Sequence, residues 1–152
     1  MSRHCFVNAG CVKKRVRREG GRNIRTRSQA CIDDTLLIDL PPDTYMHAVF
    51  GGLPLQDIEH CLITHSHFDH FVPEELDIRA ACCVAEVSHG FTVYGTNKVE
   101  AALGNRVHDQ KFSERVGFSL IEPFVSFTLM MDFTRSSLAN FPSGFTAKIS
   151  AR

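Results

Sequence analysis

The chain has 152 residues, enough for one domain with a sizeable core. It is 43% hydrophobic and 22% charged, as expected of an ordinary globular protein, and its 17 basic residues balance its 17 acidic ones. This balance excludes a general attraction of the whole chain to polyanions. The sequence has no apolar run of about 18 residues, which excludes a transmembrane helix, and the first residues do not resemble a secretory signal.

The six cysteines do not follow the even pattern of a disulfide framework. Cys61 lies in an apolar run, and Cys82 and Cys83 are adjacent. Buried free thiols in a reducing compartment are the simplest interpretation, so we expect a cytoplasmic protein.

Periodicity and turn residues predict alternating helices and strands in the first hundred residues and hairpin-like strands after them. Helices are expected over 12–19, 45–50, 74–80 and 97–103. Strands are expected over 28–32, 35–39, 61–63, 91–94, 118–121, 125–129 and 145–149. This order indicates a single α/β or α+β layered domain over residues 1–152.

The most informative feature is the run Thr64-His65-Ser66-His67-Phe68-Asp69-His70. Side chains in an extended segment alternate, so His65 and His67 can face one cation at about 2.0–2.1 Å. Asp69 and His70 can supply an oxygen and a nitrogen to a second cation about 3.5–4 Å away. The alternative is a surface histidine-rich loop that binds no metal. Three histidines and an aspartate directly after a buried strand favour metal binding, because such a strand holds ligands rigidly at its end.

With these residues the chain resembles the metallo-β-lactamase-fold superfamily, whose defining loop is His-x-His-x-Asp-His. Within it, the resemblance is to the cyclic-phosphodiesterase and phosphonate-metabolism branch. It rests on the His loop and, more weakly, on four other segments. These are Arg25–Ser28, Ile32–Asp39, Pro73–Leu76 and Val93–Gly95, with a looser match over 132–149.

The resemblance implies an αββα sandwich and a metal-dependent, phosphodiesterase-like hydrolase that acts on a small phosphoester through a metal-activated water. It also implies two zinc ions, with manganese or iron as alternatives. His65 and His67 would hold the first ion, and Asp69 and His70 the second. Asp69 would also orient the nucleophile, and Asp39 would support the ligands from behind.

The chain departs from the family pattern in the later ligands. Phe141 stands where the family has a further histidine, and a bridging aspartate and a last histidine cannot be placed before Arg152. His89 and His108 lie in no ligand-like setting, so we interpret them as ordinary surface residues. We therefore expect the N-terminal part of the sandwich, with an incomplete metal site and an apolar face that self-association or another chain would cover.

Two further features leave alternatives open. Some relatives bind a structural zinc near the N-terminus, but Cys5 and Cys11 lack a Cys-x2-Cys spacing, and unremarkable thiols are the simpler interpretation. Eight basic residues lie between Lys13 and Arg27. They could bind nucleic acid or, through Arg25 and Arg27, an anionic substrate, but a solvated helix face is favoured because no aromatic platform accompanies the charges.

The leading hypothesis from the sequence is a metal-dependent phosphoester hydrolase without a membrane partner. The alternative is a truncated, non-catalytic remnant that binds metal weakly or acts only through partners. The number of metal ligands separates the two.

Overall fold

Short, mainly apolar runs form the strands of the main sheet, and helices lie between them. The computed structural model describes residues 10–81, 90–122, 125–130 and 146–149. The strands of the main sheet are β1 (Ala30–Ile32), β2 (Leu36–Ile38), β3 (His60–Leu62), β4 (Phe91–Gly95) and β5 (Val116–Leu120). The α-helices are α1 (Gly10–Glu19), α2 (Thr44–Gly51), α3 (Glu74–Ala80), α4 (Asn97–Leu103) and α5 (Gln110–Ser113), with 3-10 turns η2 (Gly21–Asn23) and η3 (Gly104–His108). A separate hairpin pairs β6 (Phe127–Met130) with β7 (Thr146–Ile149).

The main sheet has the strand order β1-β2-β3-β4-β5. β1 and β2 are antiparallel, and each later neighbour is parallel. Between β1 and β2, Asp33 and Asp34 have φ angles of 50° and 56°. Two consecutive left-handed residues match the right-handed twist of a hairpin, and aspartate tolerates this conformation better than most residues. The strands expected over 28–32 and 35–39 form and are joined by this turn.

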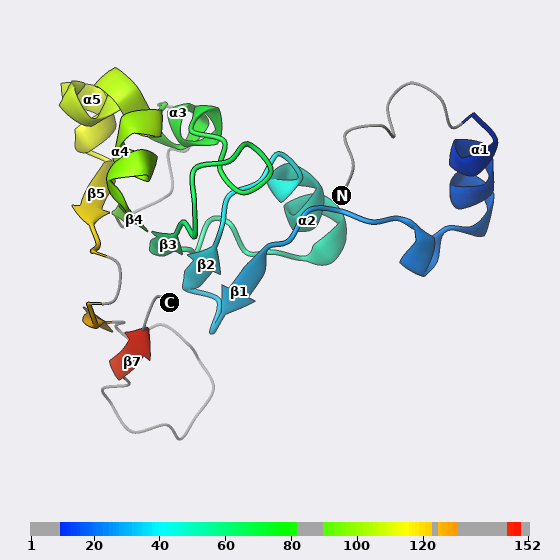
Figure 1. The fold of residues 1–152 in the computed structure, drawn as a ribbon, viewed down its shortest axis with the longest axis horizontal. Coiled ribbons are helices and arrows are strands. Elements are labelled where there is room, and N and C mark those ends of the chain that lie inside the picture. Colours follow the sequence, from blue (N-terminus) through cyan, green and yellow to red (C-terminus); the bar gives the residue numbers. More distant parts are fainter. Residues whose placement is uncertain (1–9, 82–89, 123–124, 131–145, 150–152) are drawn as a thin grey trace.

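Alternation along the strands separates two faces of the sheet. Leu37, Cys61 and Val93 are aligned across β2, β3 and β4, and each has a relative exposure of 0%. They belong to the main core, which α3, α4 and α5 cover on one side of the sheet (Figure 1). On the opposite face Leu36 and Leu62 form a smaller buried cluster. The two leucines of β2 are therefore buried on opposite faces of the sheet.

Close packing explains the glycine that ends β4. A Cβ atom added to Gly95 would lie 2.6 Å from the Cβ of Val99, which is fully buried on α4. No side chain fits there unless the helix moves, so glycine is required where the chain turns from β4 into α4.

The parallel pair β2–β3 determines where the histidine loop lies. The carboxyl ends of both strands meet at one edge of the sheet, with Asp39 after β2 and Thr64 soon after β3. Leu40 donates its N–H to His70 O and accepts from Val72 N, at 2.8 and 2.9 Å. These backbone bonds fasten the loop between β3 and α3 to the segment that follows β2.

The main prediction, a mixed α/β fold, is confirmed. The predicted helices and strands of the first hundred residues all form, with bounds that differ by a few residues. The sequence analysis did not predict η3 and α5, because their residues are mostly polar and show no clear apolar period. In the described ranges, no helix is long and apolar enough to cross a membrane.

Arg79 of α3 fastens the segment that leads into β3. Its guanidinium donates to Leu55 O and Ile58 O at 2.9 and 2.8 Å and lies 4.4 Å from the centroid of the Phe91 ring. Burial partly removes the charge of Arg79 from water, and this lowers the pKa of its guanidinium. Its hydrogen bonds satisfy two backbone carbonyls that would otherwise lack a partner inside the protein.

We expect Arg79→Met to lower the free energy of unfolding by about 2–3 kcal/mol, because two charge-assisted hydrogen bonds to backbone carbonyls are lost. Urea unfolding followed by circular dichroism measures this change. Arg18→Met is the matched control, since the Arg18 side chain is 79% exposed on α1. Equal losses in the two variants would contradict this role for Arg79.

Candidate metal centre

The histidine loop folds back on itself between β3 and α3. The N–H groups of His70 and Phe71 both donate to His67 O, at 2.9 and 2.8 Å. This tight turn brings the end of the loop back toward its beginning. His65 and His70 therefore lie close together, with ring centroids 4.0 Å apart.

Asp39 is the buried carboxylate behind the loop. It is only 4% exposed and its φ is +65°, a left-handed conformation that costs roughly 1–2 kcal/mol for a residue other than glycine. Its carboxylate accepts from the backbone N–H of Thr64 at 2.8 Å, from the Thr64 hydroxyl at 2.8 Å and from His70 Nδ1 at 2.7 Å. The strained backbone is stabilised by these contacts, which direct the carboxylate toward the loop.

These hydrogen bonds determine which ring nitrogens are left for a ligand. A buried carboxylate only accepts, so the proton between Asp39 and His70 is on His70 Nδ1. The Thr64 hydroxyl gives its proton to Asp39, so at 3.0 Å it accepts from His65 Nδ1. Both histidines therefore carry a proton on Nδ1, and in the neutral imidazole the lone pair is then on Nε2, the arrangement in which a hydrogen bond to one ring nitrogen orients the other toward a metal.

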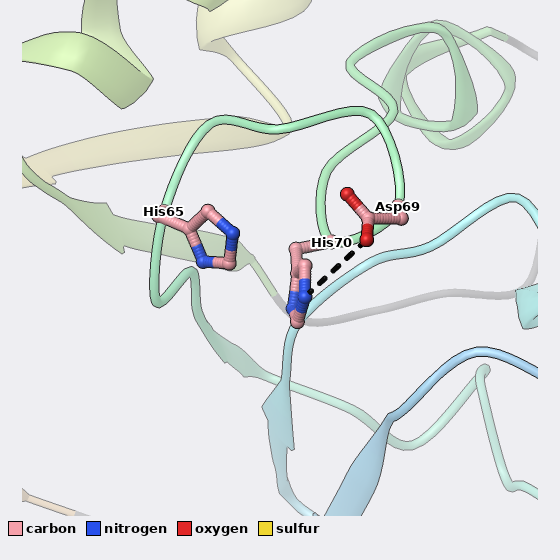
Figure 2. A group of neighbouring side chains, drawn as sticks. All are labelled: His65, Asp69 and His70. Atoms are coloured by element: carbon pink, nitrogen blue, oxygen red, sulfur yellow. Dashed lines mark ion pairs between the residues drawn. The ribbon is translucent and has the colours of Figure 1, made fainter. Parts of the chain in front are cut away.

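Figure 2 shows His65, Asp69 and His70 as one group. One possible ligand atom from each lies within 4.8 Å of those of the other two. His70 Nε2 is 3.8 Å from Asp69 Oδ2. His65 and His70 are half-buried and Asp69 is exposed, so the group is open to solvent on the carboxylate side.

His67 lies beside this group. Its ring makes an edge-on contact with the His65 ring, with centroids 4.8 Å apart, and its side chain is exposed. The structure thus groups His65 with Asp69 and His70, whereas the sequence analysis paired His65 with His67. The assignment of residues to individual ions stays a prediction.

The local electrostatics favour the protonation states that metal binding requires. Burial lowers the pKa of His65, and the neighbouring His70 and His67 lower it further, which favours neutral imidazole. The backbone N–H of Asp69 itself holds the pKa of that carboxyl below its usual range, and the nearby histidines add to the effect. Asp69 is therefore ionised at neutral pH.

The donor set suits a divalent cation. Two imidazole nitrogens and a carboxylate oxygen are typical ligands, and at metal–ligand distances of about 2.0–2.2 Å a tetrahedral zinc holds its ligand atoms about 3.3–3.6 Å apart. The ligand atoms of the group lie within 4.8 Å of one another, so they would have to move closer together to bind one ion. Zinc, manganese and iron all accept this mixture, so the donors do not select among them.

Several predicted site features lie outside the part of the chain that the structure describes. These are Phe141 and the segment around it, His89, and Cys5 of the proposed structural zinc site, while Cys11 is described only by its backbone in α1. His108 belongs to η3 and lies outside the His65 group.

Arg27, considered from the sequence as an anion ligand, is engaged within the protein. Its guanidinium pairs with both carboxylate oxygens of Asp43 at 3.0 and 3.1 Å, and its N–H donates to the same carboxylate at 2.7 Å. The guanidinium carbon also lies 5.8 Å from the centroid of the exposed Phe68 ring. Arg27 thus connects the start of α2 to the tip of the histidine loop.

Thr64 belongs to the motif but was given no role from the sequence, although a hydroxyl beside the first histidine was an available signal. Gln29 was also missed. It donates to the carbonyl oxygen of Asp39 at 3.0 Å, and this contact depends on tertiary structure, so the sequence held no signal for it.

No family model matches the chain, and no curated protein does. Among solved structures, it resembles the crystal structure of a diphosphatase from the PhnP family, with a TM-score of 0.52 and 23% sequence identity. The likeness covers 70% of this chain and 41% of that protein, so the chain spans less than half of its length. At this identity the likeness shows the fold alone, a mixed α/β arrangement shared with part of a protein whose family has the metallo-β-lactamase fold, as expected from the sequence.

We expect His70→Gln to raise the pKa of His65 part of the way back toward 6.5, because the unfavourable electrostatic interaction of a protonated His65 ring with the His70 ring is removed while burial remains. The change is measured by NMR titration of the His65 ring in chelator-treated protein. His108→Gln, in η3 and outside the His65 group, is the matched control and should leave the pKa of His65 unchanged. A pKa of His65 that falls in His70→Gln would contradict this account.

Proposed function

We propose that this chain is a metal-dependent hydrolase of small phosphoester-like substrates, with His65, His67, Asp69 and His70 as its metal ligands. The observation that carries the proposal is the group of His65, Asp69 and His70, whose possible ligand atoms lie within 4.8 Å of one another. The Thr64 hydroxyl orients the His65 ring, and the Asp39 carboxylate orients the His70 ring. The fold likeness to a PhnP-family diphosphatase supports the reaction class. The resemblance read from the sequence points to the same class.

A bound divalent cation would supply a water of lowered pKa as the nucleophile. The residues of the chain contribute the rest. As neutral imidazoles, His65 and His70 would present their Nε2 lone pairs, because Asp39 holds the proton of His70 on Nδ1 and the Thr64 hydroxyl accepts from Nδ1 of His65. Asp69 is exposed and ionised, so it can accept a hydrogen bond from the attacking water and orient it toward a phosphorus atom.

The number and identity of the ions are part of the proposal. We retain two zinc ions, with manganese or iron as alternatives, and the pairs His65 with His67 and Asp69 with His70. The contact between the His65 and His67 rings supports a shared ion for that pair.

The compartment and partners are also proposed. Cys31 and Cys61 are free thiols, and Cys61 is fully buried, which supports a reducing compartment such as the cytoplasm. A small phosphoester is the favoured substrate over nucleic acid, and self-association remains part of the hypothesis.

A second candidate function is a non-catalytic domain, a remnant that binds metal weakly or acts through partners. The observation that favours it is the ligand count. Four side chains of one loop, shared between two ions, give each ion two ligands, whereas catalytic zinc sites normally have three from the protein.

Metal content and hydrolysis separate the two functions. We expect purified protein to hold close to two metal ions per chain by elemental analysis and to hydrolyse bis(p-nitrophenyl) phosphate. His67→Ala should reduce the rate by at least about 100-fold, because a ligand is lost. His108→Ala, outside the loop, is the matched control and should keep the wild-type rate.

Metal content well below one ion per chain would contradict the proposed hydrolase function and support the non-catalytic one. Tight binding of two ions, together with hydrolysis that His67→Ala abolishes, would contradict the non-catalytic function instead.

A further inference from the structure

The side-chain amide of Gln29 makes three hydrogen bonds beside the candidate metal centre. Its Nε2 lies 3.0 Å from the carbonyl oxygen of Asp39 and 3.0 Å from Thr44 Oγ1, and its Oε1 contacts His47 Nδ1. Gln29 immediately precedes β1, while Thr44 and His47 belong to α2. One half-buried amide thus connects the start of the hairpin, the end of β2 and the first turns of a helix.

The chemistry of its partners determines the direction of each hydrogen bond of Gln29. A backbone carbonyl only accepts, so the atom of Gln29 that faces Asp39 is the NH2 group. The Thr44 hydroxyl donates to Pro41 O at 2.6 Å and therefore accepts from Gln29. The remaining Gln29 oxygen must accept, so the ring proton of His47 is on Nδ1. All the hydrogen-bonding groups that meet at Gln29 are satisfied at once, which defines a single orientation of the amide.

The hydrogen bond from Gln29 to the carbonyl oxygen of Asp39 holds the backbone of a strained residue. The N–H of Asp39 donates to Leu62 O at 2.8 Å, and its carbonyl accepts from Gln29. Both peptide groups that flank the left-handed φ of +65° are thereby held in place. A strained backbone persists only when its surroundings determine it, and the direction of the Asp39 carboxylate depends on that backbone.

We propose that Gln29 is a positioning residue for the candidate metal centre, which it orders through Asp39. The inference rests on the proposed function, because it concerns the same site. Gln29 holds the Asp39 backbone, Asp39 holds Thr64 and His70, and Thr64 holds His65. A purely structural role for Gln29, as a link between β1 and α2, is the competing explanation.

The first test is metal affinity. Gln29→Met keeps the length of the side chain and removes all three hydrogen bonds. We expect it to weaken Zn²⁺ binding about tenfold in competition with a chromogenic chelator, the lower end of the effect of removing a residue that supports a metal ligand. Gln56→Met, on an exposed glutamine that donates to Asp57, is the matched control and should bind Zn²⁺ like the wild type.

The second test needs no metal. Amide hydrogen exchange of the metal-free protein compares two neighbours, Thr64, whose N–H donates to the Asp39 carboxylate, and Ile63, whose N–H donates to Tyr94 O. In Gln29→Met the Thr64 amide should exchange about tenfold faster, since a local opening becomes easier, while Ile63 keeps its wild-type rate. Gln29→Asn, in which the amide is withdrawn by one carbon, should show the same pattern and serves if the Met variant does not fold.

The outcomes distinguish failure of the positioning role of Gln29 from failure of the proposed hydrolase function. Unchanged Zn²⁺ affinity in folded Gln29 variants overturns the positioning role. So does an equal rise in exchange at Thr64 and Ile63, which indicates general destabilisation. If the wild-type protein binds no Zn²⁺, the proposed hydrolase fails, and selective loosening of Thr64 alone then decides whether Gln29 orders Asp39.

Discussion

The carboxylate of Asp39 is a negative charge held almost out of contact with water, and it must be satisfied by hydrogen-bond donors. Those donors come from the histidine loop, namely the Thr64 N–H and hydroxyl and the His70 ring. One carboxylate thereby orders His70 directly and His65 through a hydroxyl. The Nδ1 proton of His70 is held by Asp39 and that of His65 by the Thr64 hydroxyl, so the contacts that stabilise the loop leave Nε2 of each neutral ring as the free nitrogen.

The sheet makes this arrangement possible. Parallel pairing of β2 with β3 places the end of one strand beside the start of the loop, and backbone bonds from Leu40 bring the end of the loop to the same place. Ligands at the carboxyl ends of parallel strands are a general feature of α/β proteins, because the buried strands are rigid and the loops beyond them are free to carry chemistry. Here the buried residues Leu37 and Cys61 supply the rigidity, and the exposed Asp69 supplies access to solvent.

The sequence was most informative where the determining interactions are local. The histidine loop is a run of neighbours, and the strand before it is a short apolar segment, so both could be predicted from pattern and spacing. The supporting role of Asp39 came from a resemblance, and the structure shows the contacts that such a role requires. What pattern could not provide is the grouping of side chains after a tight turn, which places His65 with His70 and Asp69 rather than with His67 alone. The contact of Gln29 with Asp39 was also hidden, since it depends on tertiary packing between a hairpin and a helix.

The most direct test of the central claim is a crystal structure of the metal-loaded protein, with the metal located by anomalous scattering. Our account predicts metal bonded to Nε2 of His65, and metal bonded to Nε2 of His70 and to a carboxylate oxygen of Asp69, with Asp39 hydrogen-bonded to His70 Nδ1 and not to the metal. Coordination through Nδ1 of either histidine, a direct bond from Asp39, or no anomalous peak at the loop would contradict it.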